Sequence, residues 1–432
     1  MKKIELVVGS CLVVSIITAC SLFYAKKQTI NIVATQLFTQ DVGNDAIETN
    51  SVDIPNSQNE AIDLMNGMYA VYWNNNTWII DGIDTPIKKQ LFSINSNPYY
   101  TDINLSNNKE LVSFSNTPNI LSVYNLLSGE TKHYTNSNVQ YLYDFKWTFN
   151  DEAIIYLASP EVFSIPDAKV GIYSVSLGTG LTTTLIDWKD DKFPYGIHGI
   201  TLSPNETQIA FYAPRNTEVM SLDPEYAVYL LNLSCLQIPN TCGDSVKYIG
   251  DGSSPEWTSD GELSWICENK NLSSVCIKAI NSEEEPRVFI SSENIISNSP
   301  EQTFISNMFW STDGKYVAIN AQSRSPTSVN GVVKDTYLIT LFEGKPIQVM
   351  KMLDENNESE FWTKGFFENR YLVLAKIIGK EQPFGDYEVR FDTTDLFLYD
   401  IQTRDKIDIN TSTDGREVFS LIARSSSSLL RK

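Results

Sequence analysis

Short apolar runs that alternate with polar turns dominate the chain from about residue 66 onward. Examples are the runs at 68–73, 153–157, 209–212 and 371–375, each flanked by Asn, Asp, Gly or Pro. Runs of this length, rich in Val, Ile, Leu, Tyr and Phe, are typical of β-strands. No long amphipathic helical pattern follows the N-terminal segment. The pattern therefore predicts an all-β fold, which is a sandwich, a barrel or a propeller.

A recurring segment distinguishes between these folds. It consists of a large apolar residue, Ser or Thr, a turn such as Asn-Glu or Asp-Gly, and a second apolar strand. Its copies begin at Leu105, Trp147, Leu202, Trp257, Trp310 and Phe366. The intervals between these residues, from 42 to 56, match the length of one four-stranded propeller blade. We therefore predict a β-propeller.

Two copies of this segment resemble a known repeat. Pro255-Glu-Trp-Thr-Ser-Asp-Gly and Phe309-Trp-Ser-Thr-Asp-Gly-Lys are similar to the TolB-type propeller repeat, Pro-x-Trp-Ser-x-Asp-Gly. The copies at Leu105 and Phe366 lack both the Trp and the Asp-Gly. The resemblance extends over residues 66–424 and implies a WD40-like propeller with a protein partner in the cell envelope. It does not imply an activity.

The number of blades depends on the two ends of this region. Residues 66–93 contain three strand-like runs before the first copy, and Glu417–Ala423 is one such run after the last blade. Together they make a seventh blade if the chain ends pair, which leaves no long sheet edge exposed. We predict seven blades, with six as the alternative.

The N-terminus carries a membrane-targeting pattern. Lys2 and Lys3 precede an apolar run, and Ile17-Thr-Ala-Cys20 resembles a bacterial lipobox. The resemblance implies that residues 1–20 are a lipoprotein signal peptide and that Cys20 carries the lipid anchor.

A transmembrane anchor is the alternative reading of the same segment. Residues 4–25 form a 22-residue stretch with one charged residue, Glu5, and this length is sufficient to span a bilayer. Either reading places the following residues outside the cytoplasm and at a membrane. We expect a flexible tether over 21–65, the propeller over 66–424 and a C-terminal tail over 425–432.

Charge and cysteine content narrow the possible partners. The 432 residues include 53 acidic and 33 basic side chains, which give a net charge of −20. This charge argues against nucleic-acid binding.

Four cysteines remain after the N-terminal segment: Cys235, Cys242, Cys267 and Cys276. Their three possible pairings stay open, and pairing of sequence neighbours is the simplest.

Known catalytic and cofactor motifs are not found in the sequence. It contains no GxSxG nucleophile elbow, no phosphate-binding glycine loop and no EF-hand-like loop. A structural zinc site is disfavoured because CxxC is absent and His133 and His198 are the two histidines. We expect no metal and no cofactor.

Polar residues at similar offsets before the repeat anchors define a candidate ligand site. The first strand of each blade lines the central channel of a propeller. The residues placed there by their offset are Asp102, Asp144, His198 and Asn307. The alternative is a polar, water-filled channel without a ligand.

The sequence thus favours a non-catalytic binding or scaffold module. Its partner is expected to be a protein, peptide or glycan of the cell envelope. The alternative is an extracellular carbohydrate-active enzyme that uses channel-mouth carboxylates, of which Asp102 and Asp144 are the first pair.

Overall fold

The computed structural model describes part of the chain. The chain divides into two units, Met1–Asn56 and Ser57–Lys432, and the described residues belong to the second. The structure describes residues 69–422 except 75–76, 83–89, 95–102, 109, 118, 126–127, 161–168, 216–224, 238–241, 270–271, 296–302, 325–331, 353–359, 368, 379–382, 385–387, 390–391 and 409–416. The predicted signal peptide with Cys20, the transmembrane alternative, the tether and the C-terminal tail lie outside the described residues.

The described residues contain seven four-stranded antiparallel sheets, here numbered as blades 1 to 7. Blade 1 contains β30 (Glu417–Ile422), β1 (Tyr69–Asn74), β2 (Thr77–Gly82) and β3 (Gln90–Ile94). Blade 2 contains β4 (Ile103–Leu105), β5 (Leu111–Thr117), β6 (Ile120–Asn125) and β7 (Thr131–Thr135). Blade 3 contains β8 (Tyr141–Trp147), β9 (Ala153–Ser159), β10 (Gly171–Ser176) and β11 (Thr182–Ile186).

The remaining blades follow in chain order. Blade 4 contains β12 (His198–Leu202), β13 (Gln208–Pro214), β14 (Tyr226–Asn232) and β15 (Val246–Asp251). Blade 5 contains β16 (Ser253–Trp257), β17 (Leu263–Asn269), β18 (Leu272–Lys278) and β19 (Arg287–Ser291). Blade 6 contains β20 (Thr303–Trp310), β21 (Tyr316–Arg324), β22 (Val332–Phe342) and β23 (Lys345–Lys351). Blade 7 contains β24 (Glu360–Phe367), β25 (Tyr371–Ile378), β28 (Asp392–Asp400) and β29 (Lys406–Asp408).

A few short elements connect the blades. They are η2 (Leu233–Gln237), η3 (Cys242–Ser245), α3 (Ser292–Ile295) and the small β26 (Pro383–Phe384) and β27 (Glu388–Val389) pair.

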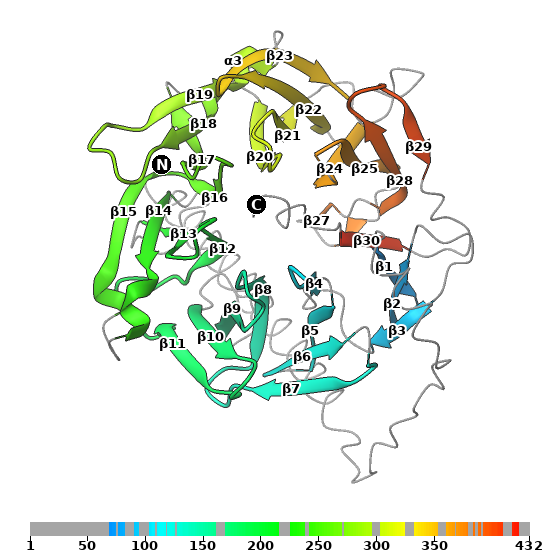
Figure 1. Ribbon diagram of the computed structural model, residues 1–432. Helices are drawn as coiled ribbons and strands as arrows, with labels where there is room; N and C mark the ends of the chain where they lie inside the picture. Colours follow the sequence, from blue (N-terminus) through cyan, green and yellow to red (C-terminus); the bar gives the residue numbers. More distant parts are fainter. Residues whose placement is uncertain are drawn as a thin grey trace, which may run out of the picture. The chain divides into compact units, whose positions relative to one another are not determined.

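The blades succeed one another around a common centre. Their first strands, from β4 to β24, lie innermost, and the fourth strands lie at the periphery (Figure 1). Contacts link each blade to the next, as between β12 and β16 and between β16 and β20. This arrangement confirms the predicted all-β propeller class.

Blade 1 combines strands from the two ends of the described chain. β1 pairs antiparallel with β30, from Tyr69 opposite Ile422 to Trp73 opposite Glu417. β30 in turn contacts β4 of blade 2 and β28 of blade 7. The innermost strand of the first blade therefore comes from the end of the sequence.

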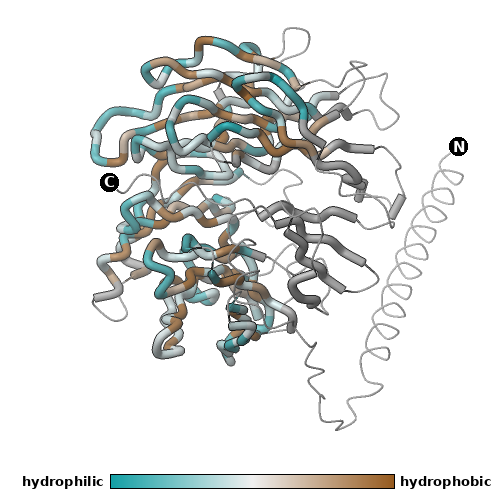
Figure 2. The backbone as a smooth tube through the Cα atoms, turned by 45° about the vertical axis from the view of Figure 1, so that its right-hand side comes forward, coloured by the Kyte–Doolittle hydropathy of each residue, from teal (hydrophilic) through white to brown (hydrophobic). Residues whose placement is uncertain are grey.

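Apolar side chains fill the sheets and the spaces between them. Hydrophobic stretches follow the strands through the blades, while many turns are hydrophilic (Figure 2). The largest fully buried side chains include Trp265, Tyr156 and Phe211. Burial of this apolar surface is the main stabilising contribution to the fold.

The tryptophan repeat anchors join neighbouring blades, because each indole N–H donates to the preceding blade. Trp147 Nε1 donates to the Asn104 carbonyl at 3.3 Å. Trp310 Nε1 donates to Ser264 Oγ at 2.8 Å. The anchor therefore has a hydrogen-bonding role between blades as well as an apolar one.

The turn after each anchor is stabilised by its own side chains. Ser203 Oγ donates to Asn205 Oδ1 at 2.8 Å, and Ser311 Oγ donates to Asp313 Oδ1 at 2.8 Å. Gly314 has a φ of 69°, a left-handed conformation that glycine adopts without steric cost. This geometry is the reason for the recurring Ser/Thr and Asp-Gly pattern.

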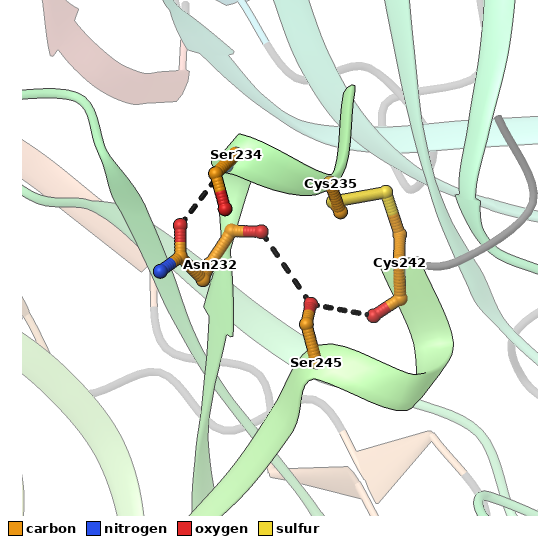
Figure 3. Close-up of a disulfide and its surroundings, with 5 residues drawn as sticks. All are labelled: Asn232, Ser234, Cys235, Cys242 and Ser245. Carbon is orange, nitrogen blue, oxygen red and sulfur yellow. Dashed lines mark hydrogen bonds between the residues drawn. A yellow bond between two sulfur atoms is a disulfide. The ribbon is translucent and has the colours of Figure 1, made fainter. Parts of the chain in front are cut away.

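Two disulfides confirm the pairing of sequence neighbours. Cys235 is bonded to Cys242, and Cys267 is bonded to Cys276. The first joins η2 to η3, where Ser245 Oγ also donates to the Cys242 carbonyl (Figure 3). Disulfides of this kind indicate an oxidising, extracytoplasmic compartment. No helix among the described residues is long and apolar enough to span a bilayer.

Candidate functional site

The inner strands are interrupted by bulges at similar places. The pairing register shifts between Tyr143 and Lys146 in β8, between His198 and Ile200 in β12, and between Ser253 and Glu256 in β16. The residues at these shifts have positive φ angles, 52° at Asp144, 43° at Gly199 and 51° at Ser254. Bulges bend a strand and redirect its side chains. Each shift precedes a repeat anchor.

Residues from three consecutive blades are connected at these bulges. Lys146 Nζ lies 2.7 Å from Asp144 Oδ1. Asp144 Oδ2 accepts a 2.6 Å hydrogen bond from the backbone N–H of Ile200 in the next blade. Thr201 Oγ1 donates to Glu256 Oε2 at 3.4 Å, which connects blade 4 to blade 5. We refer to Asp144, Lys146, Thr201 and Glu256 as the inner-strand cluster.

Glu256 is the carboxyl group most affected by its surroundings. Burial raises the pKa of Glu256 to about 7, and the nearby Asp144 charge contributes in the same direction. The Lys146 ammonium and the Thr201 hydroxyl act in the opposite direction on this pKa. Glu256 is therefore partly protonated near neutral pH, so it can either donate or accept a proton.

His198 lies in an aromatic environment in blade 4. Its ring stacks on Tyr212 at a centroid distance of 5.5 Å and meets Tyr226 edge-on at 5.7 Å. Burial lowers the pKa of His198 to about 4. The imidazole is therefore neutral at physiological pH.

The four predicted channel residues are brought together only in part. Asp102 lies outside the described residues. Asp144 and His198 both neighbour Tyr212, whose pKa is raised by burial to about 12 with a contribution from Asp144. Asn307 is an exposed residue of β20, next to the register shift of that strand. No interaction between Asn307 and Asp144 or His198 is found among the described residues.

Three members of the cluster were not predicted from the sequence: Lys146, Thr201 and Glu256. Each immediately precedes a repeat anchor, Trp147, Leu202 or Trp257. The channel-facing position of Asp144 stays a prediction. A second position, the residue next to the anchor, contacts the neighbouring blade through Thr201 and Glu256. A comparison of this second position across the copies would have identified Glu256.

The described part of the chain contains no group of three or more His, Cys, Asp or Glu side chains arranged to hold a metal ion. The inner-strand cluster instead combines two carboxyl groups, Asp144 and Glu256, with the Lys146 ammonium. Its chemistry suits a polar ligand that both donates and accepts hydrogen bonds.

Two solved structures superimpose with TM-scores above 0.5 and support the fold. Puromycin hydrolase superimposes with a TM-score of 0.54 and 10% sequence identity, covering 84% of this chain and 56% of that chain. A puromycin-hydrolyzing peptidase of Mycobacterium tuberculosis gives a TM-score of 0.51 and 9% identity, with 84% and 56% coverage. An oligogalacturonate lyase in complex with manganese gives a TM-score of 0.49 and 10% identity, with 79% and 84% coverage.

These similarities concern the fold alone. The chain spans 56% of the length of the two puromycin-hydrolysing enzymes. No protein-family model and no curated protein sequence matches it. The TolB-type relationship therefore stays an interpretation of the repeat.

Proposed function

We propose that this protein is a membrane-tethered, extracytoplasmic β-propeller that binds a protein or peptide of the cell envelope without catalysing a reaction. The lipobox at Cys20 supports the tether, and the two disulfides support the compartment. The resemblance of its repeats to the TolB type supports a protein partner. The inner-strand cluster is the proposed polar contact.

The hydrogen bonding of Asp144 is the observation that carries this proposal. One of its oxygens contacts Lys146, and the other accepts from Ile200 N–H. A carboxylate with both oxygens engaged is poorly suited to act as a nucleophile or a base. It is well suited to hold a strand and a lysine in fixed positions. Lys146 keeps 38% of its side chain exposed, so its ammonium can also contact a ligand.

The test is a cross-linked pull-down of the tagged full-length protein from its own membranes. A stoichiometric protein or peptide partner is expected with the wild-type chain, and Lys146→Ala is expected to reduce its capture about tenfold. Lys132→Ala, at an exposed residue of β7, is the matched control. If Lys146→Ala and Lys132→Ala capture equal amounts of the partner, the inner-strand cluster is excluded as its contact site. If the wild-type protein captures no partner, the binding function is contradicted.

The same sample tests the membrane tether. Mass spectrometry of the N-terminal peptide is expected to show acylated Cys20 as the first residue. An intact, unmodified N-terminus would instead establish the transmembrane alternative.

A carbohydrate-active enzyme is the second candidate, and Glu256 is the observation that favours it. A carboxyl group whose pKa is raised by burial near a second carboxyl group is the arrangement that glycosidases use for a general acid. Turnover of plant and bacterial polysaccharides by the wild-type protein, lost in Glu256→Gln, would establish this function. Equal rates for the two proteins would exclude it.

A further inference from the structure

A second site is suggested by a groove between blades 4 and 5. Its volume is about 410 Å³, within the range of small-molecule sites. It is bordered by the β12–β13, β16–β17 and β18–β19 turns. Its lining includes Gln208, Trp257, Asp260, Glu262, Ile280 and Asn281. The groove shares no residue with the inner-strand cluster.

Two other blade junctions are closed by hydrogen bonds between such turns. Between blades 2 and 3, the Asp151 carboxylate accepts hydrogen bonds from the backbone N–H groups of Asn107 and Asn108, each at 2.8 Å. Between blades 6 and 7, Asn369 Oδ1 accepts from Thr312 N at 2.7 Å and from Thr312 Oγ1 at 2.8 Å. At the junction of blades 4 and 5, the corresponding turns border a groove instead.

Blades 5 and 6 show how closely such turns can pack. A Cβ atom added at Gly314 would collide with the side chain of Ser259. A Cβ atom added at Gly261, which lines the groove, would meet nothing within 4 Å. The same position in the repeat is therefore filled by protein in one case and faces open space in the other.

The lining has the chemistry of a site for an uncharged, hydroxyl-rich ligand. Gln208 and Asn281 offer amide groups that both donate and accept hydrogen bonds. Asp260 adds a carboxylate acceptor, while Glu262 is already paired with Arg287 at 3.2 Å. The partly exposed indole of Trp257 supplies an aromatic surface, of the kind on which the apolar face of a sugar ring can pack.

We propose that this groove binds a short, neutral oligosaccharide. The mixture of amide donors and acceptors fits sugar hydroxyls, each of which both donates and accepts. A strongly cationic peptide is a poorer fit because one of the two carboxylates, Glu262, already has an arginine partner. This site is independent of the protein-binding function proposed for the inner-strand cluster.

The test is calorimetric titration of the detergent-solubilised full-length protein with cellotetraose, maltotetraose and tetra-N-acetylchitotetraose, and separately with tetralysine. At least one neutral tetrasaccharide is expected to bind. Asp260→Ala combined with Asn281→Ala is expected to weaken that binding roughly tenfold or more, because two hydrogen-bonding side chains are removed. Both residues are exposed, so we expect the fold to be retained, and thermal unfolding of the double variant checks this.

Glu283→Ala combined with Glu284→Ala is the matched control. These exposed residues follow the same β18–β19 turn but do not line the groove, and this double variant should bind as the wild type does. The proposal would be overturned if only tetralysine bound or if no tetrasaccharide bound. It would also be overturned if both double variants lost the same amount of tetrasaccharide affinity. If Asp260→Ala/Asn281→Ala still captures the protein partner, the groove and the inner-strand cluster bind their ligands independently, so each proposal is tested separately.

Discussion

Two carboxyl groups of the inner strands, Asp144 and Glu256, differ in how their charge is compensated. Asp144 has a lysine at 2.7 Å and a backbone N–H at 2.6 Å. Glu256 has one hydroxyl donor at 3.4 Å and a raised pKa. Both oxygens of Asp144 are therefore engaged by protein donors, while the protonation of Glu256 responds to pH near neutrality.

The raised pKa of Glu256 predicts a pH-dependent cost to stability. Between the ordinary value of 4.5 and about 7, the folded protein binds more protons than the unfolded chain. The contribution of Glu256 is therefore most favourable below pH 4.5 and is lost as pH rises through 7. We expect Glu256→Gln to be more stable than the wild type at pH 8, by on the order of 2 kcal/mol, and the difference to fall below about 1 kcal/mol at pH 5.

Thermal unfolding of both proteins at the two pH values measures this difference. Glu284→Gln, at an exposed position, serves as the control and should shift neither curve. A Glu256→Gln difference that is equal at pH 5 and pH 8 would contradict the assigned ionisation.

Asp144 combines a hydrogen bond between blades with a left-handed backbone at a φ of 52°. Asp144→Ala removes the acceptor and places alanine in a conformation it rarely adopts, so we expect a loss of about 2–3 kcal/mol. Asp144→Asn keeps one acceptor and tolerates this φ, so its loss should be about 1 kcal/mol. Urea unfolding tests the order, and equal losses would show that neither the retained acceptor nor the backbone angle matters there.

At the scale of strands and turns, repetition is combined with local differences. The bulges in β8, β12 and β16 occupy similar positions, yet they carry Asp144, Gly199 and Ser254 respectively. The two disulfides belong to consecutive blades. One joins the short helices after β14, and the other links the neighbouring strands β17 and β18. The repeat therefore provides a common backbone, while single residues give each blade its chemistry.

Each disulfide closes a short loop, with sequence separations of 7 and 9. Loops of this size restrict the unfolded chain by about 2–3 kcal/mol. We expect Cys235→Ser/Cys242→Ser and Cys267→Ser/Cys276→Ser to lower the free energy of unfolding by similar amounts. In the variant that lacks both disulfides, we expect the two losses to be additive. Urea denaturation of the three variants tests this, and an unchanged midpoint in either pair would refute the stabilising role.

At the scale of the whole propeller, the pairing of β1 with β30 joins the two ends of the described chain. Five residue pairs form this ladder. Removal of residues 417–432 leaves β1 with an unpaired edge, and we expect a loss on the order of 5 kcal/mol together with aggregation. Removal of residues 425–432 alone is the control and should have little effect. Light scattering and thermal unfolding distinguish the two truncations.

The parts of this fold that follow local rules were predictable from the sequence. The Ser-Thr-Asp-Gly turn before Lys315 is stabilised by its own side chains, so its chemistry is visible in a few adjacent residues. The short spacings of the cysteine pairs likewise made the disulfide pairing predictable. Pairing of the chain ends followed from counting strands in fours.

The candidate site was less accessible to sequence reasoning. The pKa of Glu256 depends on Lys146 and Asp144, which lie two blades earlier, and no local pattern connects these residues. The groove beside Trp257 likewise depends on the spacing between turns of separate blades. Both features arise from long-range packing, which the repeat pattern alone does not specify.

The joining of β1 to β30 also determines the order in which the protein can be completed. At about 5–20 residues per second, translation of the segment between these strands takes roughly 20–70 s. During that time β1 exists without the strand that finally covers its edge. Until β30 is synthesised, the unpaired edge of β1 can pair with strands of other chains, so it has to be protected from aggregation. The pairing of β1 with β30 therefore creates a need for chaperones during synthesis of the protein.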